Sequence, residues 1–257
     1  MADTKRGRFV WYDLMTTDPE QARTFYGELT GWTTTPWQGD EPYDVWVNGE
    51  HPIGGLMQLP PEVAQAGAPP HWLGYVEVAD VGTAVARAVS LGGGVLKSAT
   101  EIPGAGEFAV LSDPQGGVIA IYRGTGDSPM PEGEPGPGQV SWHELMTTNV
   151  DDAWGFYHAM FGWEKTEAMD MGEAGIYQMF GWGDGVPQGG IFNTPPGMEQ
   201  PGWLYYIMVQ DVDAAAEPVK TGGGRILNGP MEVPGGDRIV QCMDPQGAAF
   251  ALHARAG

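Results

Sequence analysis

The chain has 257 residues, of which 42% are hydrophobic and 11% aromatic. That length suits one large or two ordinary domains, and the aromatic content excludes a disordered chain, because buried rings offset the entropy lost on ordering. Its 33 acidic and 12 basic residues give a formal net charge of −21, so the surface repels phosphate backbones and anionic lipid. Composition therefore predicts a folded protein that binds neither nucleic acid nor a membrane.

The cysteine content and the length of the apolar runs exclude further classes of protein. Cys242 is the only cysteine, which excludes an internal disulfide and a cysteine-rich metal site. No apolar run approaches the length that spans a membrane, and residues 1–9 have no apolar signal core. We therefore expect a cytoplasmic protein.

The sequence contains an internal repeat, in which motifs of the first half recur 131 residues later. They are DLMTT at 13–17 and ELMTT at 144–148, FY at 25 and 156, GW at 31 and 162, WL at 72 and 203, and DPQG at 113 and 244. Between the copies, residues 124–138 have the Gly, Pro and acidic composition of a linker. The repeat predicts a first domain over 1–123, a linker over 124–138 and a second domain over 139–257.

Each half resolves into two similar modules. A strand over 8–15 precedes Asp18-Pro19, which is typical of a helix N-cap with proline at the first helical position. Apolar residues at 22, 25, 26 and 29 then predict one face of a helix, followed by strands near 33–37, 43–48 and 53–59. The second module has a strand over 73–78, a helical stripe at 81, 84, 85 and 88, and strands near 95–97, 108–112 and 118–122.

The second copy repeats this order, although Pro218 is expected to kink or shorten its last helix. The chain therefore consists of four βαβββ modules. We predict an α+β fold in which helices pack on one face of curved, mixed sheets.

Paired βαβββ modules, a helix that ends in Phe-Tyr before Gly-Trp, and Asp-Pro-Gln-Gly before the last strand resemble the vicinal oxygen chelate superfamily. This superfamily includes glyoxalase I, extradiol dioxygenases, fosfomycin-modifying enzymes and bleomycin-binding proteins. The resemblance covers almost the whole chain except the linker and the termini, and the chain looks most like bacterial proteins with two glyoxalase-like domains in tandem. It implies two such domains, each with a cup formed by curved sheets.

The resemblance also implies where metal ligands would lie, because metal-dependent relatives place His or Glu on the first and last strands of the modules. In this chain those positions hold Trp, Leu, Gly and Ala, whose side chains do not coordinate a divalent ion. We therefore predict no metal and no other cofactor. The eight positions are Trp11, Gly55, Leu73, Ala120, Trp142, Gly190, Leu204 and Ala251.

Strand alternation predicts which side chains line the cups in place of a metal, because every second residue of a strand faces the same side. Aromatic and apolar side chains there suit a small aromatic or polycyclic ligand, and an arginine can orient a ligand carboxylate or phenolate. The predicted ligand-binding residues are Trp11, Met15, Tyr75, Tyr122, Trp142, Met146, Tyr206 and Arg238.

Three further residues are candidates for acid–base catalysis. Asp13 and Glu144 lie on first strands and His253 on a last strand, and a buried carboxylate and an imidazole can exchange a proton near neutral pH. Two alternatives stay open: Trp11 and Trp142 can be core residues that plug the cup, and the carboxylates can be structural. Which first strand shares a cup with His253 depends on whether modules pair within a half or across the halves.

Two functions fit these residues. The first is a metal-free protein that sequesters or carries a small hydrophobic or aromatic molecule, as bleomycin-binding relatives do. The second is a metal-independent enzyme of secondary metabolism, such as an isomerase, cyclase or hydratase, in which a carboxylate and His253 act as acid and base. We also expect a monomer, because four modules in one chain supply what two chains supply in single-domain relatives.

Overall fold

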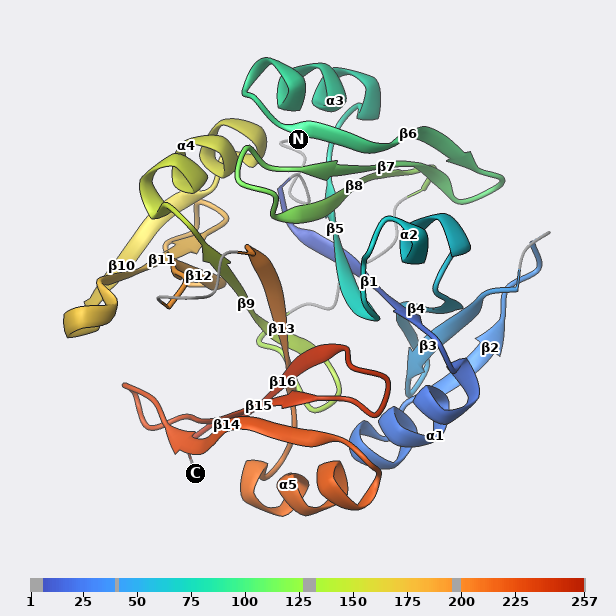
Figure 1. The fold of residues 1–257 in the computed structure, drawn as a ribbon, viewed down its shortest axis with the longest axis vertical. Helices are drawn as coiled ribbons and strands as arrows, with labels where there is room; N and C mark the ends of the chain where they lie inside the picture. The colour runs from blue at the N-terminus through green and yellow to red at the C-terminus, as the bar shows by residue number, and fades with distance from the viewer. Residues whose placement is uncertain (1–6, 40–41, 127–132, 196–199, 257) are drawn as a thin grey trace. The chain divides into compact units, whose positions relative to one another are not determined.

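The computed structural model describes residues 7–39, 42–126, 133–195 and 200–256 (Figure 1). These residues form sixteen β-strands, five α-helices and one short 3-10 helix. Residues 127–132 of the predicted linker lie outside the described residues. The architecture is α+β, as the sequence predicts.

The first half contains two βαβββ modules joined by a short helix, α2 (Pro61–Gln65), which the sequence did not predict. The first module consists of β1 (Phe9–Thr16), α1 (Pro19–Thr30), β2 (Thr33–Pro36), β3 (Asp44–Asn48) and β4 (His51–Gln58). The second module consists of β5 (His71–Glu77), α3 (Val81–Ser90), β6 (Gly94–Ile102), β7 (Gly106–Ser112) and β8 (Val118–Gly124).

The second half repeats the two modules. The third module of the chain consists of β9 (Val140–Thr147), α4 (Val150–Phe161), β10 (Glu164–Asp170), the 3-10 helix η1 (Gly172–Ala174), β11 (Ile176–Gly181) and β12 (Gly189–Asn193). The fourth consists of β13 (Gly202–Met208), α5 (Val212–Thr221), β14 (Arg225–Glu232), β15 (Arg238–Met243) and β16 (Ala249–Ala254).

The helix boundaries follow the capping residues. The Asp18 carboxylate accepts a hydrogen bond from the Gln21 N–H at 3.0 Å, and Asn149 does the same for the second copy. Both helices end at a left-handed glycine, Gly31 with φ 78° and Gly162 with φ 73°. The predicted N-cap at Asp18 is therefore confirmed.

The strands form two mixed, eight-stranded sheets, one from each half. Their orders are β2-β3-β4-β1-β5-β8-β7-β6 and β10-β11-β12-β9-β13-β16-β15-β14. Within a module the first strand runs parallel to the last, and the other neighbours are antiparallel. The predicted mixed sheets are therefore confirmed.

The chain packs into two compact units, and each unit takes one module from each half. Unit 1 comprises residues 1–10, 74–131 and 142–203, and unit 2 comprises residues 11–73, 132–141 and 204–257, as far as these are described. In unit 1, α3 lies beside α4, and in unit 2, α1 lies beside α5 (Figure 1). The division of the chain into domains over 1–123 and 139–257 stays a prediction.

Repeated motifs meet in the core of unit 2. The Tyr26 hydroxyl donates to Asp244 Oδ2 at 3.1 Å and accepts a hydrogen bond from Trp72 Nε1 at 2.9 Å. Burial raises the pKa of both Tyr26 and Asp244. Trp32 is buried beside them and donates its Nε1–H to the Gly138 carbonyl at 2.8 Å. The motifs FY, GW, WL and DPQG therefore have a shared structural role.

Unit 1 contains the matching cluster. Tyr157 donates to Asp113 Oδ2 at 3.0 Å and accepts from Trp203 Nε1 at 3.2 Å. Trp163 is fully buried and donates to the Gly7 carbonyl at 2.6 Å. In both units the motif tyrosine comes from one half of the chain and the aspartate from the other, so the repeat is needed to complete each core.

Pro218 lies inside α5 without shortening it, since that helix has ten residues, as many as α3. The final turn is closed beyond the proline by the Gly222 N–H, which donates to the Pro218 carbonyl at 2.9 Å. The expected shortening is therefore wrong: the proline removes a single N–H from the helix, and the turn that follows it is still closed by hydrogen bonds. None of the helices among the described residues has the length and hydropathy that crossing a membrane requires.

Candidate functional site

Trp11, Asp13 and Tyr43 form a hydrogen-bonded group in unit 2, the Asp13 triad. The Trp11 Nε1–H lies 2.8 Å from the Tyr43 hydroxyl oxygen and 2.9 Å from Asp13 Oδ1. The Tyr43 hydroxyl donates to the same carboxylate oxygen at 2.7 Å. Asp13 is only 4% exposed, so both donors act on a buried carboxyl group.

Gly55 makes room for this triad. Strand β4 pairs with β1 so that Gly55 lies opposite Asp13. A Cβ at residue 55 would overlap the Tyr43 hydroxyl and approach Asp13 Oδ1 to 2.5 Å. Glycine is required here because a neighbouring side chain fills the space above the strand.

Unit 1 contains the equivalent Glu144 triad. Trp142 donates its Nε1–H to the Tyr177 hydroxyl at 2.7 Å, and that hydroxyl donates to Glu144 Oε2 at 3.1 Å. Glu144 and Tyr177 are 7% and 8% exposed. Gly190 lies opposite Glu144 on β12, and a Cβ at residue 190 would overlap the Tyr177 ring. Phe192 stacks on the same ring, with centroids 5.5 Å apart.

Each triad has its tryptophan at a position where the resemblance implies a metal ligand, and lies opposite a glycine at another such position. The residues at these positions do not fit a divalent metal ion. The indole nitrogens of Trp11 and Trp142 carry hydrogens and donate them, so they cannot coordinate a cation. A ligand side chain at residue 55 or 190 would collide with a triad tyrosine. Over the described ranges, no three His, Cys, Asp or Glu side chains are grouped so that they could hold a metal.

The predicted lining residues of the second module lie in unit 1. Tyr75 is buried, and its ring centroid is 5.9 Å from that of Phe108. The Tyr122 hydroxyl donates to the Ala105 carbonyl at 2.8 Å. Burial raises the pKa of Tyr122, and the nearby charge of Glu77 raises it further. This region is therefore mainly aromatic.

The corresponding region of unit 2 is more polar. Tyr206 is buried, and its hydroxyl accepts a hydrogen bond from Gln241 Nε2 at 2.8 Å. Met15 in unit 2 and Met146 in unit 1 are half-buried on their first strands. No contact described here tests whether Tyr206, Met15 or Met146 lines a ligand site, so these assignments stay predictions.

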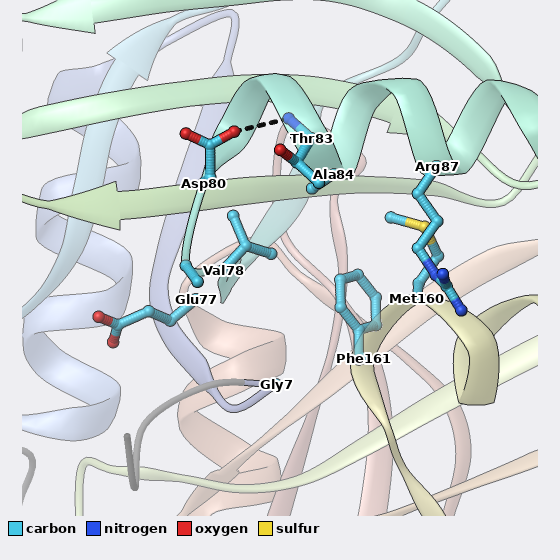
Figure 2. A pocket seen from close by; sticks show the side chains of 10 residues that line it. Gly7, Glu77, Val78, Asp80, Thr83, Ala84, Arg87, Met160 and Phe161 are labelled. Carbon is cyan, nitrogen blue, oxygen red and sulfur yellow. Dashed lines mark hydrogen bonds between the residues drawn. The ribbon is translucent and has the colours of Figure 1, made fainter. Parts of the chain in front are cut away.

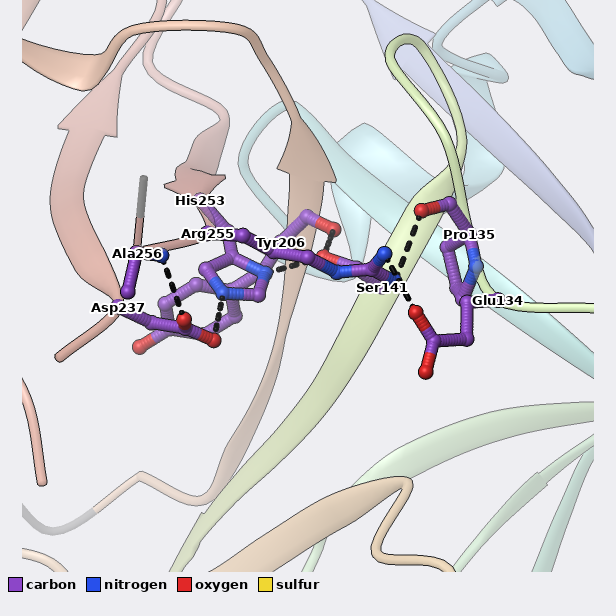
Figure 3. A network of polar contacts seen from close by, with 8 residues as sticks. All are labelled: Glu134, Pro135, Ser141, Tyr206, Asp237, His253, Arg255 and Ala256. Carbon is purple, nitrogen blue, oxygen red and sulfur yellow. Dashed lines mark hydrogen bonds and ion pairs between the residues drawn. The ribbon is translucent and has the colours of Figure 1, made fainter. Parts of the chain in front are cut away.

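His253 is the centre of a polar network in unit 2 (Figure 3). Its Nε2 lies 2.8 Å from Asp237 Oδ2, and its Nδ1 lies 2.8 Å from Ser141 Oγ. Partial burial works to raise the pKa of Asp237, but hydrogen bonds from the Ala256 N–H and from His253 outweigh it, so that pKa lies below its ordinary value. The predicted pairing of His253 with a first-strand carboxylate stays a prediction.

Two arginines of unit 2 form ion pairs. The Arg238 guanidinium approaches the Asp213 carboxylate at 2.8 and 2.9 Å, and its side chain is 39% exposed. Arg255 pairs with Glu134 at 2.6 Å and donates to the Pro135 carbonyl at 3.1 Å (Figure 3). The predicted role of Arg238 in ligand binding would require it to leave Asp213, and it stays a prediction.

His143, which follows Trp142 on β9, is buried in an aromatic cluster of unit 1. Its ring stacks on Phe9 with centroids 4.2 Å apart, and its Nδ1 lies 2.8 Å from the Gln188 carbonyl oxygen. Burial lowers the pKa of His143 to about 4, and the hydrogen bond with the Gln188 carbonyl, which raises this pKa, offsets only part of the effect. His143 is therefore neutral at pH 7 and has a packing role.

Two cavities of unit 1 have no triad residue in their lining. The first, of about 80 Å³, lies at the start of α3, between Asp80, Val78 and Phe161 (Figure 2). Small-molecule pockets occupy roughly 300–1,000 Å³, so it has room for water only. The second is an open groove of about 460 Å³ beside α4, and Asp151, Asp152 and Phe156 are among the residues that line it.

Tyr43 and Tyr177 were not predicted as site residues. The signal that could have found them is the glycine pair on the fourth strand, at 54–55 and 189–190, because a glycine inside a strand marks the close approach of another group. Each tyrosine precedes its glycine pair by about a dozen residues. Sequence spacing alone does not say which side chain fills that space.

The family assignment rests on comparisons that cover nearly the whole chain. Residues 10–122 match the model of the glyoxalase-like domain, and residues 139–252 match that of the glyoxalase/bleomycin resistance protein/dioxygenase superfamily. The chain is 32% identical to "Putative glyoxylase CFP32" of Mycobacterium tuberculosis over 98% of its own length and 96% of that protein. It is 30% identical to anthracycline biosynthesis protein DauV of a Streptomyces species over 96% of its length and 92% of that protein.

Solved structures agree with this fold. A Mn(II)-bound glyoxalase from Novosphingobium aromaticivorans superposes with a TM-score of 0.67 at 15% identity, covering 98% of this chain and 83% of that one. The 2,3-dioxygenase LapB from Pseudomonas sp. KL28 has the same TM-score and identity, covering 100% and 94%. The chain belongs to the vicinal oxygen chelate superfamily and contains two of its domains in tandem.

Proposed function

We propose that this protein binds a small hydrophobic or aromatic molecule at its Trp–Tyr–carboxylate triads, without a divalent metal. The observation that carries the proposal is that, in both halves, an indole stands at an implied ligand position and a phenol fills the space beside the glycine at another, with the phenol hydrogen-bonded to one carboxylate.

The chemistry of the triads favours an aromatic ligand. Indole and phenol rings offer large flat apolar faces together with fixed polar atoms, which is the combination that binds fused-ring molecules in an oriented way. Two relatives at 30% identity are named as anthracycline biosynthesis proteins, DauV and DnrV. Their names support a polycyclic aromatic ligand for this chain.

Fluorescence titration tests the proposal. A neutral anthraquinone should quench the tryptophan emission to a saturating level, and Trp11→Ala or Trp142→Ala should weaken this binding while the variant stays folded. If these tryptophans are core residues instead, each truncation will cost about 3–5 kcal/mol of stability. Trp11→Phe and Trp142→Phe keep a ring and remove only the N–H, so they separate loss of packing from loss of the triad. Absence of quenching by the wild-type protein would contradict the proposal.

We infer a second candidate function, a metal-independent acid–base enzyme, from the network around His253. An imidazole held between Asp237 and Ser141 at 2.8 Å on each side can pass a proton from one nitrogen while it gains one at the other. Mass spectrometry of a bound ligand after incubation distinguishes the two functions. An unchanged mass supports a binding protein, and conversion that His253→Gln abolishes supports the enzyme.

A further inference from the structure

The groove beside α4 in unit 1 has the size and the lining of a small-molecule site. Its volume of about 460 Å³ falls in the range of roughly 300–1,000 Å³ that such sites occupy. Leu91, Pro114 and Phe156 supply apolar surface, and Gly155 adds no side chain. A Cβ at residue 155 would have no other group within 4 Å, so this side of the groove is open. A small apolar body can therefore lie against α4.

The charged groups in the lining are two carboxylates, Asp151 and Asp152. Among the residues that the structure describes, no Lys, Arg or His forms an ion pair with either of them. Asp152 accepts a hydrogen bond from Asn149 Nδ2 at 2.9 Å, which leaves its negative charge in place. Two carboxylates without a cation favour a positively charged ligand.

The N-terminus of α4 does not turn the groove into an anion site. Free N–H groups at the start of a helix can bind an anion, but those of α4 are already used within the chain. The Asn149 side chain accepts from the N–H groups of Asp151 and Asp152 at 3.0 and 3.2 Å. The Val150 N–H donates to Asn193 Oδ1 at 3.0 Å. The aspartates therefore decide the sign of the charge that the groove accepts.

The equivalent place in unit 2, 131 residues away along the repeat, is built differently. There Gln246 Nε2 donates to Gln21 Oε1, so two side chains bridge α1 and the DPQG turn. In unit 1 the matching Gln115 donates instead to the Asn149 carbonyl at 3.1 Å, and an aspartate, Asp152, stands at the position of Gln21. The carboxylates beside this turn are therefore a property of unit 1.

We propose that the groove binds a small primary ammonium with an apolar body, such as an alkyl or cycloalkyl amine. The ammonium contacts Asp151 and Asp152, and the apolar body lies on Leu91, Pro114 and Phe156. The site shares no residue with either triad, so the inference goes beyond the proposed function and does not depend on it.

Isothermal titration calorimetry with three probes tests this site. Cyclohexylmethylammonium has the charge and the apolar body, cyclohexylmethanol has only the body, and methylammonium has only the charge. At 0.15 M salt the Debye length is about 8 Å, so the more distant charges of the acidic surface are screened. We expect one site per chain for cyclohexylmethylammonium, with an affinity about tenfold or more above that of either other probe, because each lacks one of the two contacts.

Substitutions on α4 locate the binding, and the same substitutions on α1 are the matched controls. Gly155→Leu fills the groove with a good helix former and should abolish binding, whereas Thr24→Leu at the equivalent position of α1 should leave it unchanged. Asp151→Asn should weaken binding about threefold to fivefold, as expected for one exposed ion pair. Glu20→Gln removes the equivalent charge from α1 and should have no effect. Circular dichroism shows that each variant is folded.

Each other outcome overturns the inference. If cyclohexylmethanol binds as tightly as the ammonium, the carboxylates do not select the ligand. Equal weakening by Asp151→Asn and Glu20→Gln would show a general attraction to the acidic surface, and binding that survives in Gly155→Leu would lie outside the groove. Absence of binding by all three probes would also refute the site. None of these results bears on the triads, because the probes contain no aromatic ring.

Discussion

The Asp13 triad and the Glu144 triad share a plan but differ in how the indole is used. In unit 2 the Trp11 N–H lies within hydrogen-bond distance of both Tyr43 and Asp13, so the three groups form a closed ring. In unit 1 the hydrogen bonds run in a chain from Trp142 through Tyr177 to Glu144.

The regions built by the second modules differ more than the triads do. Unit 1 has Tyr75 beside Phe108, whereas unit 2 has Tyr206 hydrogen-bonded to Gln241 and a polar network at His253. The two triads are therefore alike, whereas the regions built by the second module of each half differ. We expect this pattern if the two triads bind related groups on different ligands, or different parts of one ligand.

Adding a side chain opposite a triad should have the largest effect. Gly190→Ala places a Cβ about 2 Å from atoms of the Tyr177 ring, so the ring must move and its hydrogen bonds with Trp142 and Glu144 break. Overpacking and the lost bonds together should cost about 4 kcal/mol in the free energy of unfolding, measured by urea denaturation. Gly155→Ala on α4 has open space and is the control, with no loss expected. A Gly190→Ala variant as stable as wild type would show that Tyr177 is not fixed in the triad.

Acid should destabilise unit 1 more than unit 2. The pKa of His143 is about 4 in the folded protein and near 6.5 in the unfolded chain. Between these values the folded state binds fewer protons than the unfolded state, so the free energy of unfolding falls as the pH falls from 6.5 toward 4. This loss is about 3 kcal/mol when complete. In unit 2, burial raises the pKa of Asp244 above its ordinary value. As the pH falls toward that ordinary value, the folded state therefore takes up a proton before the unfolded state does, and a destabilising buried charge is removed.

Hydrogen exchange measured at pH 6.5 and pH 4.5 separates the two units, because peptides from β9 and α4 should lose protection before those from α1 and α5. The equivalent position in the first half is Tyr12, so His143→Tyr is the matched variant and should abolish the acid sensitivity of unit 1. Equal loss of protection in both units of the wild-type protein would contradict this account.

The motif tyrosines should have a smaller effect. Tyr26→Phe removes the donor to Asp244 and leaves the buried Trp72 N–H without its acceptor, which should cost about 2 kcal/mol. Tyr157→Phe makes the same change in unit 1 and should cost about as much. Thermal unfolding measures both, and a loss in only one unit would show that the two clusters are not equivalent.

The ion pair at the surface should matter least. Arg238 and Asp213 are both well exposed, and exposed pairs contribute roughly 0–1 kcal/mol. Arg238→Ala should therefore leave the melting temperature nearly unchanged. If it also weakens binding of an anthraquinone, Arg238 has the ligand role that the sequence predicts, and unit 2 differs from unit 1 in using a cation.

The sequence predicts the modules and the repeat because helix periodicity, caps and glycine turns act locally. The repeat also marks Trp32, Trp163 and the two DPQG motifs, which the structure places in the cores of the two units. The triads were half predicted, since strand alternation places Trp11 and Asp13 on one face but does not say that Tyr43 reaches them. The mixing of modules from both halves in each unit depends on long-range contacts such as Tyr26 to Asp244, for which the sequence has no local signal.

Calorimetric titration of 2-naphthol before and after complete chelation of divalent metals tests the central claim most directly. The account predicts the same affinity and stoichiometry in both titrations, because Trp11 and Trp142 stand at two implied ligand positions and Tyr43 and Tyr177 fill the space beside Gly55 and Gly190. Binding that is lost on chelation and restored by Mn²⁺ or Zn²⁺ would contradict it.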